Sequence, residues 1–242
     1  SLETESNLHE REVPVSDCKD SIAVVIPVLD VADDIAAAID SARAAENVDV
    51  IVVDGGSTDG SANIAERHGV RILTNVPNRA GQMNAGAAAT ESDILVFLHG
   101  DTRLPGGYGA LVREVLNDPS VAVGAFRLGI DAEGWPYRLI ETVANWRSRF
   151  LSLPYGDQAC FMKRATFERL GGFTKMPIME DYDFVQRAQR HGRITIVNGT
   201  VKTSAHRWQS LGPVKTTLIN YAVVIGYHLG VPVERLAAWY GR

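Results

Sequence analysis

Three short polar segments of the chain carry side chains that could do chemistry. Residues 54–61 (DGGSTDGS) offer the carboxylate of Asp54 in a glycine-rich turn, where it can accept hydrogen bonds from a base or a ribose. His99–Gly100–Asp101 join an imidazole to a carboxylate, a pair that can hold a divalent cation against a diphosphate. Glu180–Asp181 supply a carboxylate that can deprotonate a hydroxyl nucleophile. Each segment also has a plain structural interpretation, as a loop, a capped turn and an acidic helix start respectively.

Two further groups of residues leave their roles open. Arg79, Gln82 and Asn84 could reach a nucleotide or a phosphate, or they could cap and solvate a helix. Residues 206–208 (HRW) could supply a metal ligand, a cation near phosphate and a stacking ring, although a lone histidine near a tryptophan is more often structural.

Several common catalytic and binding motifs are absent from the sequence. It contains no GxxxxGK[ST], GxGxxG, HExxH or GxSxG pattern. Its two cysteines, Cys18 and Cys160, are far apart and form no CxxC pair, which argues against a disulfide framework or a structural zinc site.

The elements that must position these residues follow an alternating pattern in the first half of the chain. Short apolar runs rich in β-branched residues predict strands at 21–28, 48–53, 70–75 and 94–98. Helical segments are predicted between them at 33–45, 62–68 and 79–90. This alternation indicates an α/β fold with a doubly wound, largely parallel sheet. Ligands of such sheets bind at the carboxyl ends of the strands, where the first two polar segments fall.

The second half breaks this rhythm. Helices are predicted at 105–117, 136–152, 164–170 and 180–191, and strands at 121–130, 158–163 and 193–198. A helical tail is predicted at 214–239, interrupted by Gly230 and Pro232. Its apolar stripe, at 218–233, is more typical of core packing than of a dimer interface or a membrane contact, and all three interpretations stay open.

The composition limits the class of protein. The chain has 242 residues, of which 45% are hydrophobic, enough for one large α/β domain with a core. Its 24 basic and 29 acidic residues give a net charge of −5, which argues against a nucleic-acid binder. It has no apolar run of about 18 residues that would predict a transmembrane helix. Residues 1–20 lack the pattern of a signal peptide and are interpreted as a flexible leader, so we expect a cytoplasmic protein.

Taken together and in order, six segments resemble the family 2 glycosyltransferases with a GT-A fold, most of all small, single-domain bacterial members. The matching segments are residues 24–30 (VVIPVLD), 50–61 (VIVVDGGSTDGS), 79–89 (RAGQMNAGAAA), 94–105 (ILVFLHGDTRLP), 156–173 (GDQACFMKRATFERLGGF) and 177–193 (PIMEDYDFVQRAQRHGR). The resemblance implies a Rossmann-like, mixed but mostly parallel sheet flanked by helices. We expect this domain over 21–208, and a C-terminal helical extension over 209–242 that packs on it or at an interface.

The resemblance also implies roles for particular residues. His99–Gly100–Asp101 match the family's DxD motif, and Glu180–Asp181 match its ED motif with Asp181 as the base. The residues expected to contact the nucleotide are Pro27, Leu29, Asp30, Asp54, Gly56, Arg79, Gln82, Asn84, His99 and Gly100. The residues expected at the acceptor or the donor sugar are Gly156, Asp157, Gln158 and Trp208. The expected metal ligands are Asp101, His99 and His206.

The chain departs from the family pattern at three points. It has Asp54–Gly55 where two acidic residues are frequent, His99 at the first DxD position, and Asp30–Val31–Ala32 where an Asn-Glu pair is common.

The resemblance implies an inverting glycosyltransferase that uses Mn²⁺ or Mg²⁺ to move a sugar from a UDP- or GDP-linked donor to an acceptor hydroxyl. A nucleotidyltransferase and an inactive nucleotide-binding module are the alternatives. The acceptor is unknown, and a lipid-linked acceptor, a peripheral location at the inner face of the membrane and a homodimer stay open.

Overall fold

The first strand, β1 (Ile22–Val28), is buried along its whole length in the middle of a sheet. The computed structural model describes residues 19–75 and 77–241, so most of the predicted leader at 1–20 lies outside the described residues. Side chains of β1 alternate between two cores because successive residues of a strand point to opposite faces. Ile22, Val24 and Ile26 meet one layer of helices, while Ala23 and Val25 meet the other.

The sheet has eight strands in the order β3-β2-β1-β4-β7-β6-β8-β5. The strands after β1 are β2 (Val48–Asp54), β3 (Arg71–Thr74), β4 (Ile94–Phe97), β5 (Thr102–Arg103), β6 (Val121–Asp131), β7 (Phe161–Lys163) and β8 (Arg193–Ser204). β1 to β4 are parallel to one another, and β6 is parallel to β8. β7 is antiparallel to both β4 and β6 and so joins the two parallel parts, which confirms a mixed sheet.

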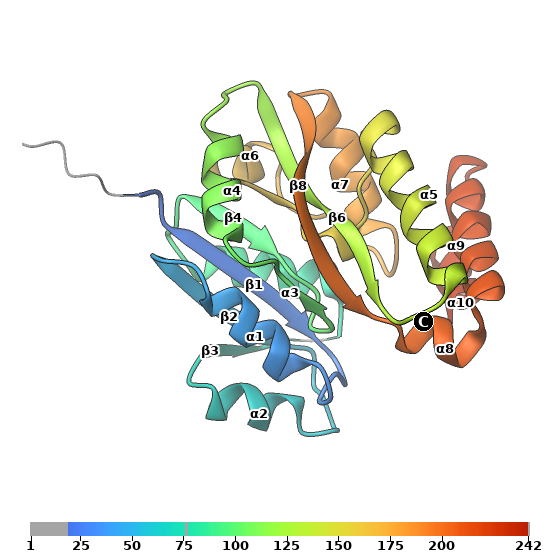
Figure 1. Cartoon of the computed structure of the whole chain (residues 1–242), viewed down its shortest axis with the longest axis horizontal. Helices are drawn as coiled ribbons and strands as arrows, with labels where there is room; N and C mark the ends of the chain where they lie inside the picture. The colour runs from blue at the N-terminus through green and yellow to red at the C-terminus, as the bar shows by residue number, and fades with distance from the viewer. Residues whose placement is uncertain (1–18, 76, 242) are drawn as a thin grey trace, which may run out of the picture.

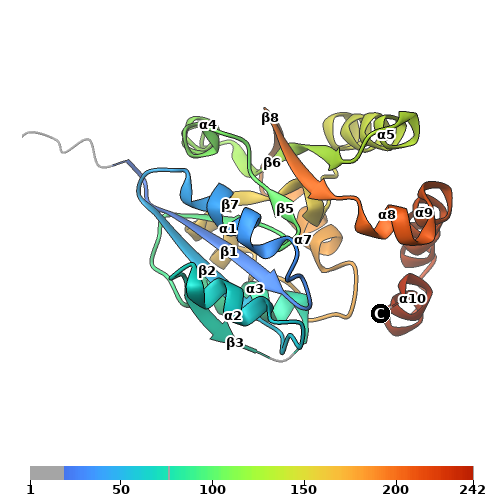
Figure 2. The same ribbon diagram turned by 60° about the horizontal axis from the view of Figure 1, so that its bottom comes forward.

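Helices cover both faces of this sheet (Figures 1 and 2). They are α1 (Ile35–Arg43), α2 (Ser61–Arg67), α3 (Arg79–Ala88), α4 (Tyr108–Leu116), α5 (Trp135–Leu151), α6 (Arg164–Arg169), α7 (Glu180–Gln189), α8 (His206–Leu211), α9 (Pro213–His228) and α10 (Val233–Tyr240), with a short 3₁₀ turn, η1 (Gly156–Gln158). The first core contains apolar side chains of α1, α2 and α4, and the second contains those of α3, α6 and α7.

Two predicted strands differ from the structure, and one strand was not predicted. The strand expected at 158–163 begins only at Phe161, because η1 and a left-handed Ala159 precede it. The strand expected at 193–198 continues to Ser204: Asn198–Gly199 look like a stop, but β8 resumes its pairing with β6 beyond them. β5 was not predicted, because two residues that pair with β8 leave no sequence pattern.

The C-terminal helices pack on the rest of the chain. Val223 of α9 and Leu236 of α10 form an apolar cluster with Ile178, Met179 and Tyr182 at the start of α7. The break between α9 and α10 falls at the predicted Gly230 and Pro232. Among the described residues, no helix is both long enough and apolar enough to cross a bilayer.

Helix α3 approaches the sheet closely at Gly86. A Cβ atom there would lie 2.3 Å from Cγ1 of Val25 and 3.0 Å from Cγ2 of Val53, so an added methyl group requires the strands to move. Overpacking of this kind costs about 1–3 kcal/mol.

We therefore expect Gly86→Ala to lower the free energy of unfolding by about 1–3 kcal/mol, measured by urea denaturation. Gly106→Ala is the control, because a Cβ atom at Gly106 meets nothing within 4 Å. Equal stability of the two variants would contradict the close packing of α3 on β1.

Candidate active site

The loops after β1 and β2 are braced against each other by their own polar groups. Oδ1 of Asp30 accepts a hydrogen bond from the backbone N–H of Thr58 at 2.8 Å. Asp54 accepts bonds from the backbone N–H groups of Gly56 and Ser57, each at 3.1 Å. These two carboxylates therefore fix the shape of the loops in which they lie.

The remaining residues predicted along these strand ends have varied surroundings. Pro27 is part of β1, whereas the Leu29 side chain is 46% exposed just beyond its end. Gly100 follows β4 and packs against the end of β1, since a Cβ atom there would lie 3.1 Å from Cγ1 of Val28.

Two amides of α3 hold the scaffold together. Nε2 of the buried Gln82 donates to the carbonyl oxygens of Val28 and Val53, each at 2.8 Å, and so ties together the ends of β1 and β2. Asn84 bonds the backbone N–H and C=O of Phe173 at 2.9 and 2.8 Å. The contacts in this structure are those of structural residues, and a role of either residue in nucleotide binding stays a prediction.

A pocket of about 270 Å³ lies between the strand ends and the C-terminal helices. It brings together eight residues predicted from the sequence: Arg79, His99, Asp101, Gly156, Asp157, Asp181, Arg207 and Trp208. His206 does not line it, and its side chain is exposed at the start of α8. Asp181, from the last polar segment, thus lines the pocket. Asp54, from the first, does not line it and bonds the backbone of its own loop.

Arg79 organises the charges of this pocket. Its Nε forms an ion pair with Oε1 of Glu180, a side chain that is only 1% exposed. Its Nη1 lies 3.2 Å from Nε2 of His99. Burial alone would lower the pKa of Arg79, but the carboxylates of Glu180 and Asp181 outweigh it and raise that pKa. Arg79 is therefore a permanent cation between α3, β4 and α7.

Asp181 is held in its ionised form. Burial alone would raise its pKa, but Arg79 and two backbone N–H groups outweigh burial and hold that pKa below its ordinary value. These groups are the N–H of Gly156, 2.6 Å from Oδ2, and the N–H of Tyr182, 2.8 Å from Oδ1. Residue 156 has to be glycine, because a Cβ atom would lie 2.9 Å from Oδ2 of Asp181 and 2.8 Å from Nε2 of His99.

Two other carboxyl groups in the pocket have a pKa that is raised rather than lowered. Burial raises the pKa of Asp101, whose Oδ1 accepts a bond from the Thr102 hydroxyl at 3.1 Å. Burial also raises the pKa of Asp157, to about 6, although Arg147 opposes it. Oδ1 of Asp157 is buried and has no hydrogen-bond partner among the described residues.

Gln158 fixes the turn that carries Asp157. Its buried side chain donates to the carbonyl of Phe126 at 2.9 Å and accepts from the Ser148 hydroxyl at 2.7 Å. It thereby ties η1 to β6 and α5. Its contacts are structural in this structure, and direct contact with a sugar stays a prediction.

The C-terminal helices supply one wall of the pocket, with Asn220, Val223, Val224 and Tyr240. The guanidinium of Arg207 stacks on the Tyr240 ring at 3.6 Å and donates to its carbonyl oxygen at 2.8 Å. The sequence did not single out Asn220 or Tyr240, because neither lies in a recognisable motif and only the fold brings them to the site.

Residues 23–171 match the family model described as glycosyl transferase family 2. The chain belongs to glycosyl transferase family 2. The match covers more than half of the chain and includes the turn at Asp54, the segment at His99–Asp101 and the turn η1. The second acidic motif of this glycosyltransferase-family chain, at Asp181, lies outside the matched range.

Curated relatives and solved structures agree with this membership. Uncharacterized glycosyltransferases of Mycobacterium bovis and Mycobacterium tuberculosis are 28% identical over 134 residues, which are 54% of this chain and 60% of theirs. The chain thus spans about 60% of the length of these relatives. A mannosyltransferase from Pyrobaculum calidifontis, in complex with GDP-Man and Mn²⁺, has a TM-score of 0.63 at 18% identity over 83% of this chain and 62% of its own. S. aureus TarS in complex with UDP has a TM-score of 0.61 at 15% identity over 84% and 64%. The fold of the family 2 chain is therefore the GT-A fold.

Because burial raises the pKa of Asp157, the ionised form of this side chain lowers the free energy of unfolding near neutral pH. A carboxyl whose pKa is about 6 when folded, against 3.8 ordinarily, binds its proton more tightly in the folded state. Its contribution to the free energy of unfolding is therefore full below about pH 4 and is lost as the pH rises towards about 6.

We expect Asp157→Asn to be more stable than the unaltered chain at about pH 7.5, by roughly 1–3 kcal/mol, with the gain vanishing near pH 4. Urea denaturation across this pH range measures it. Asp33→Asn, at an exposed position outside the pocket, controls for the removal of a negative charge. A variant that gains nothing at the higher pH would show that Asp157 is not strained by burial.

Proposed function

We propose that this chain transfers a sugar from a nucleoside-diphosphate sugar to an acceptor hydroxyl, with Asp181 as the general base. The observation that carries the proposal is the state of Asp181: it is ionised, oriented by two backbone N–H groups and faces a pocket next to the permanent cation Arg79. Family membership and the bound GDP-Man and UDP of the structural neighbours support the donor class.

The chain's own residues account for the two charge changes of the reaction. Asp181 takes the proton of the acceptor hydroxyl as its oxygen attacks the anomeric carbon. Arg79 places positive charge near the leaving diphosphate, where negative charge develops in the transition state. A single displacement from the face opposite the leaving group inverts the anomeric centre, and NMR of the product against the donor tests this.

The described residues of this pocket offer few ligands for a divalent cation. The described residues contain no group of three or more His, Cys, Asp or Glu side chains arranged to hold a metal ion. Of the three predicted metal ligands, Asp101 offers a buried carboxylate with a raised pKa, which a cation would relieve, whereas His99 is already paired with Arg79. This donor set suits Mg²⁺ or Mn²⁺ shared with substrate phosphates rather than a cage made only of protein. When bound, such an ion neutralises charge on the diphosphate.

The donor base, the donor sugar and the location belong to the same proposal. UDP and GDP are the candidate nucleotides, and the loops after β1 and β2 are the candidate base site. We place the reaction in the cytoplasm, at the inner face of the membrane where the acceptor is a lipid.

Asp181→Asn is expected to lower kcat by at least about 10²-fold, because a positioned base contributes about 10²–10⁴-fold. Nucleotide binding should persist, since Asn keeps an oxygen for the Gly156 N–H. The assay follows release of nucleoside diphosphate in the presence of acceptor.

The matched control for this variant is Asp183→Asn. It lies on the same helix but bonds Thr174 and Arg187, away from the pocket. Full activity of Asp181→Asn would refute the assignment of the base.

Asp101→Asn is expected to abolish the part of nucleotide binding that depends on Mn²⁺. A thermal-shift screen of UDP-, GDP- and dTDP-sugars, each with and without Mn²⁺, measures this, because a ligand of the folded state raises the melting temperature by mass action. Equal Mn²⁺-dependent shifts in the variant and the unaltered chain would exclude Asp101 as the ligand. Absence of a shift with every nucleotide would contradict the proposed donor class itself.

A further inference from the structure

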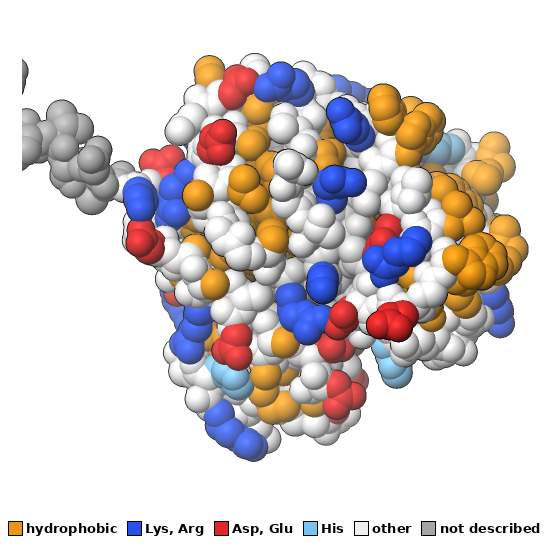
Figure 3. Space-filling model, viewed as in Figure 1, with side chains coloured by type: hydrophobic (Ala, Val, Ile, Leu, Met, Phe, Trp, Pro, Cys, Tyr) orange, Lys and Arg blue, Asp and Glu red, His pale blue; other side chains and the backbone are white. Residues whose placement is uncertain are grey.

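Two neighbouring helices carry matching apolar stripes on their outer surfaces. On α5 the stripe is Trp135, Leu139, Val143, Trp146 and Phe150, and on α9 with its C-cap residue it is Val214, Leu218, Tyr221, Ile225 and Leu229. All ten side chains are at least 40% exposed. Hydrophobic side chains gather over these two helices at the right of the molecule (Figure 3). Contiguous apolar surface of this kind marks a site of interaction.

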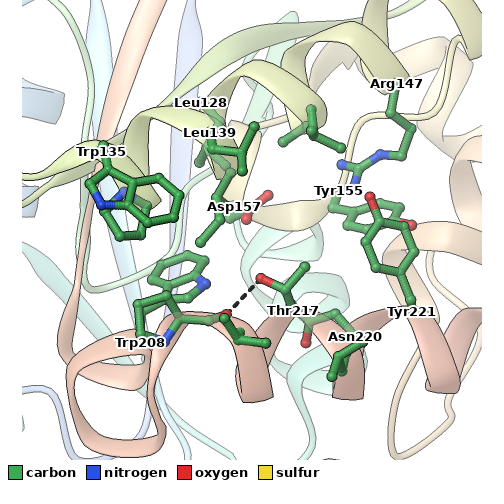
Figure 4. A pocket seen from close by; sticks show the side chains of 17 residues that line it. Leu128, Trp135, Leu139, Arg147, Tyr155, Asp157, Trp208, Thr217, Asn220 and Tyr221 are labelled. Carbon is green, nitrogen blue, oxygen red and sulfur yellow. Dashed lines mark hydrogen bonds between the residues drawn. The ribbon is translucent and has the colours of Figure 1, made fainter.

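A groove of about 420 Å³ runs between the two helices, a volume typical of small-molecule sites. Leu139 and Val143 of α5 line one side, and Val214 and Leu218 of α9 line the other. Figure 4 shows Trp135 and Leu139 facing Trp208 and Thr217, with Asp157 between the two rows. The groove is thus apolar along its length and polar where it meets Asp157.

The groove and the catalytic pocket meet at four shared residues: Tyr155, Asp157, Trp208 and Asn220. Three of them have buried polar atoms without a hydrogen-bond partner in the described part of the chain. These atoms are the carboxylate Oδ1 of Asp157, the indole N–H of Trp208 and the amide Oδ1 of Asn220. Since buried polar groups are normally bonded, one donor and two acceptors left open at one junction indicate a polar ligand group there.

We propose that the acceptor is a lipid with a hydroxyl-bearing head, whose apolar chain lies in the groove between α5 and α9 and whose head lies at the junction of Asp157, Trp208 and Asn220. This inference rests on the proposed glycosyl transfer. A hydroxyl both donates and accepts, so it matches the one open donor and the two open acceptors.

The transfer step then balances without a further reactant. The head oxygen forms a bond to the anomeric carbon of the donor as the bond from that carbon to the diphosphate oxygen breaks. The hydroxyl proton passes to Asp181, and the nucleoside diphosphate leaves with the electron pair of the broken bond.

The shape of the surface favours a lipid chain over a second copy of the protein. A dimer needs a complementary face but no channel into the catalytic pocket, whereas this groove ends at residues that line that pocket. The exposed stripes on either side of the groove would rest in the surface of a bilayer, from which the lipid enters.

Alkyl β-glucosides of increasing chain length test the groove, with one head and only the chain varied. Tryptophan fluorescence measures their binding below the micelle concentration, because Trp135 and Trp208 line the groove. We expect octyl glucoside to bind at least tenfold more tightly than methyl glucoside, since each buried methylene contributes up to about fourfold. Equal affinities would overturn the inference.

Two variants locate the chain within the groove. Leu218→Glu should weaken octyl glucoside binding at least tenfold, because it places a charge in the groove. Leu229→Glu is the matched control, since it adds the same charge at another largely exposed leucine outside the lining, and should change the affinity less than twofold. Circular dichroism and melting temperature confirm that both variants fold. Equal losses would mean that the apolar face binds detergent without a defined groove, and would overturn the inference.

A third variant tests the head. Trp208→Phe keeps an aromatic ring and removes the indole N–H, so it should weaken octyl glucoside binding about twofold to tenfold. An unchanged affinity would exclude this hydrogen bond and with it the placement of the head.

Sedimentation velocity tests the remaining alternative, that a second copy of the protein occupies the groove. A dimer of the unaltered chain that Leu218→Glu or octyl glucoside dissociates would assign the groove to a second copy instead. Because the glucosides bind without a donor, these outcomes are independent of the nucleotide screen, in which failure of the proposed function itself would appear.

Discussion

The arrangement of the site depends on one buried group of charges, Arg79 with Glu180 and Asp181. Breaking a buried ion pair by removing one partner costs about 3–5 kcal/mol, so its members hold one another in place. Arg79 begins α3 and the two carboxylates begin α7, helices that lie about 100 residues apart in the chain. Their pairing fixes the start of α3 next to the start of α7. Glu180 pairs with Arg79 through Oε1, while Asp181 faces the pocket and stays charged.

Around this ion pair, glycines leave space for neighbouring groups, and an amide side chain bonds backbone carbonyls. Gly156 leaves room for the side chains of Asp181 and His99 beside its backbone, and Gly86 lets α3 lie close to β1. Gln82 replaces water at the ends of two strands, where backbone carbonyls would otherwise lack partners. Rigid support of this kind can hold a functional side chain within about 0.5 Å of one position.

The amino-acid pattern predicted the first four strands, the helices between them and the acidic motifs, because each produces a local signal. Alternation of apolar runs placed the strands, Asp101 falls in a motif that follows a buried strand, and Asp181 falls in one that opens a helix. β5 and the second half of β8 could not be predicted, since their pairing depends on distant residues rather than on local propensity. Gln82 and Asn84 were expected to reach a nucleotide or to cap and solvate a helix, whereas in the structure they bond the backbone of other elements, which no local pattern shows. Asn220 and Tyr240 reach the pocket only because α9 and α10 fold back onto α7.

The division of the pocket between the two ends of the chain has a consequence for divergence within the family. The strand ends and Arg79 lie inside the family-matched range, whereas Trp208, Asn220 and Tyr240 come from the last three helices. Substitutions at these three positions can reshape one wall while the carboxylate, the cation and the sheet residues stay the same. In this way the residues at the strand ends can be inherited unchanged, while the molecules that bind beside the last three helices differ from one lineage to the next.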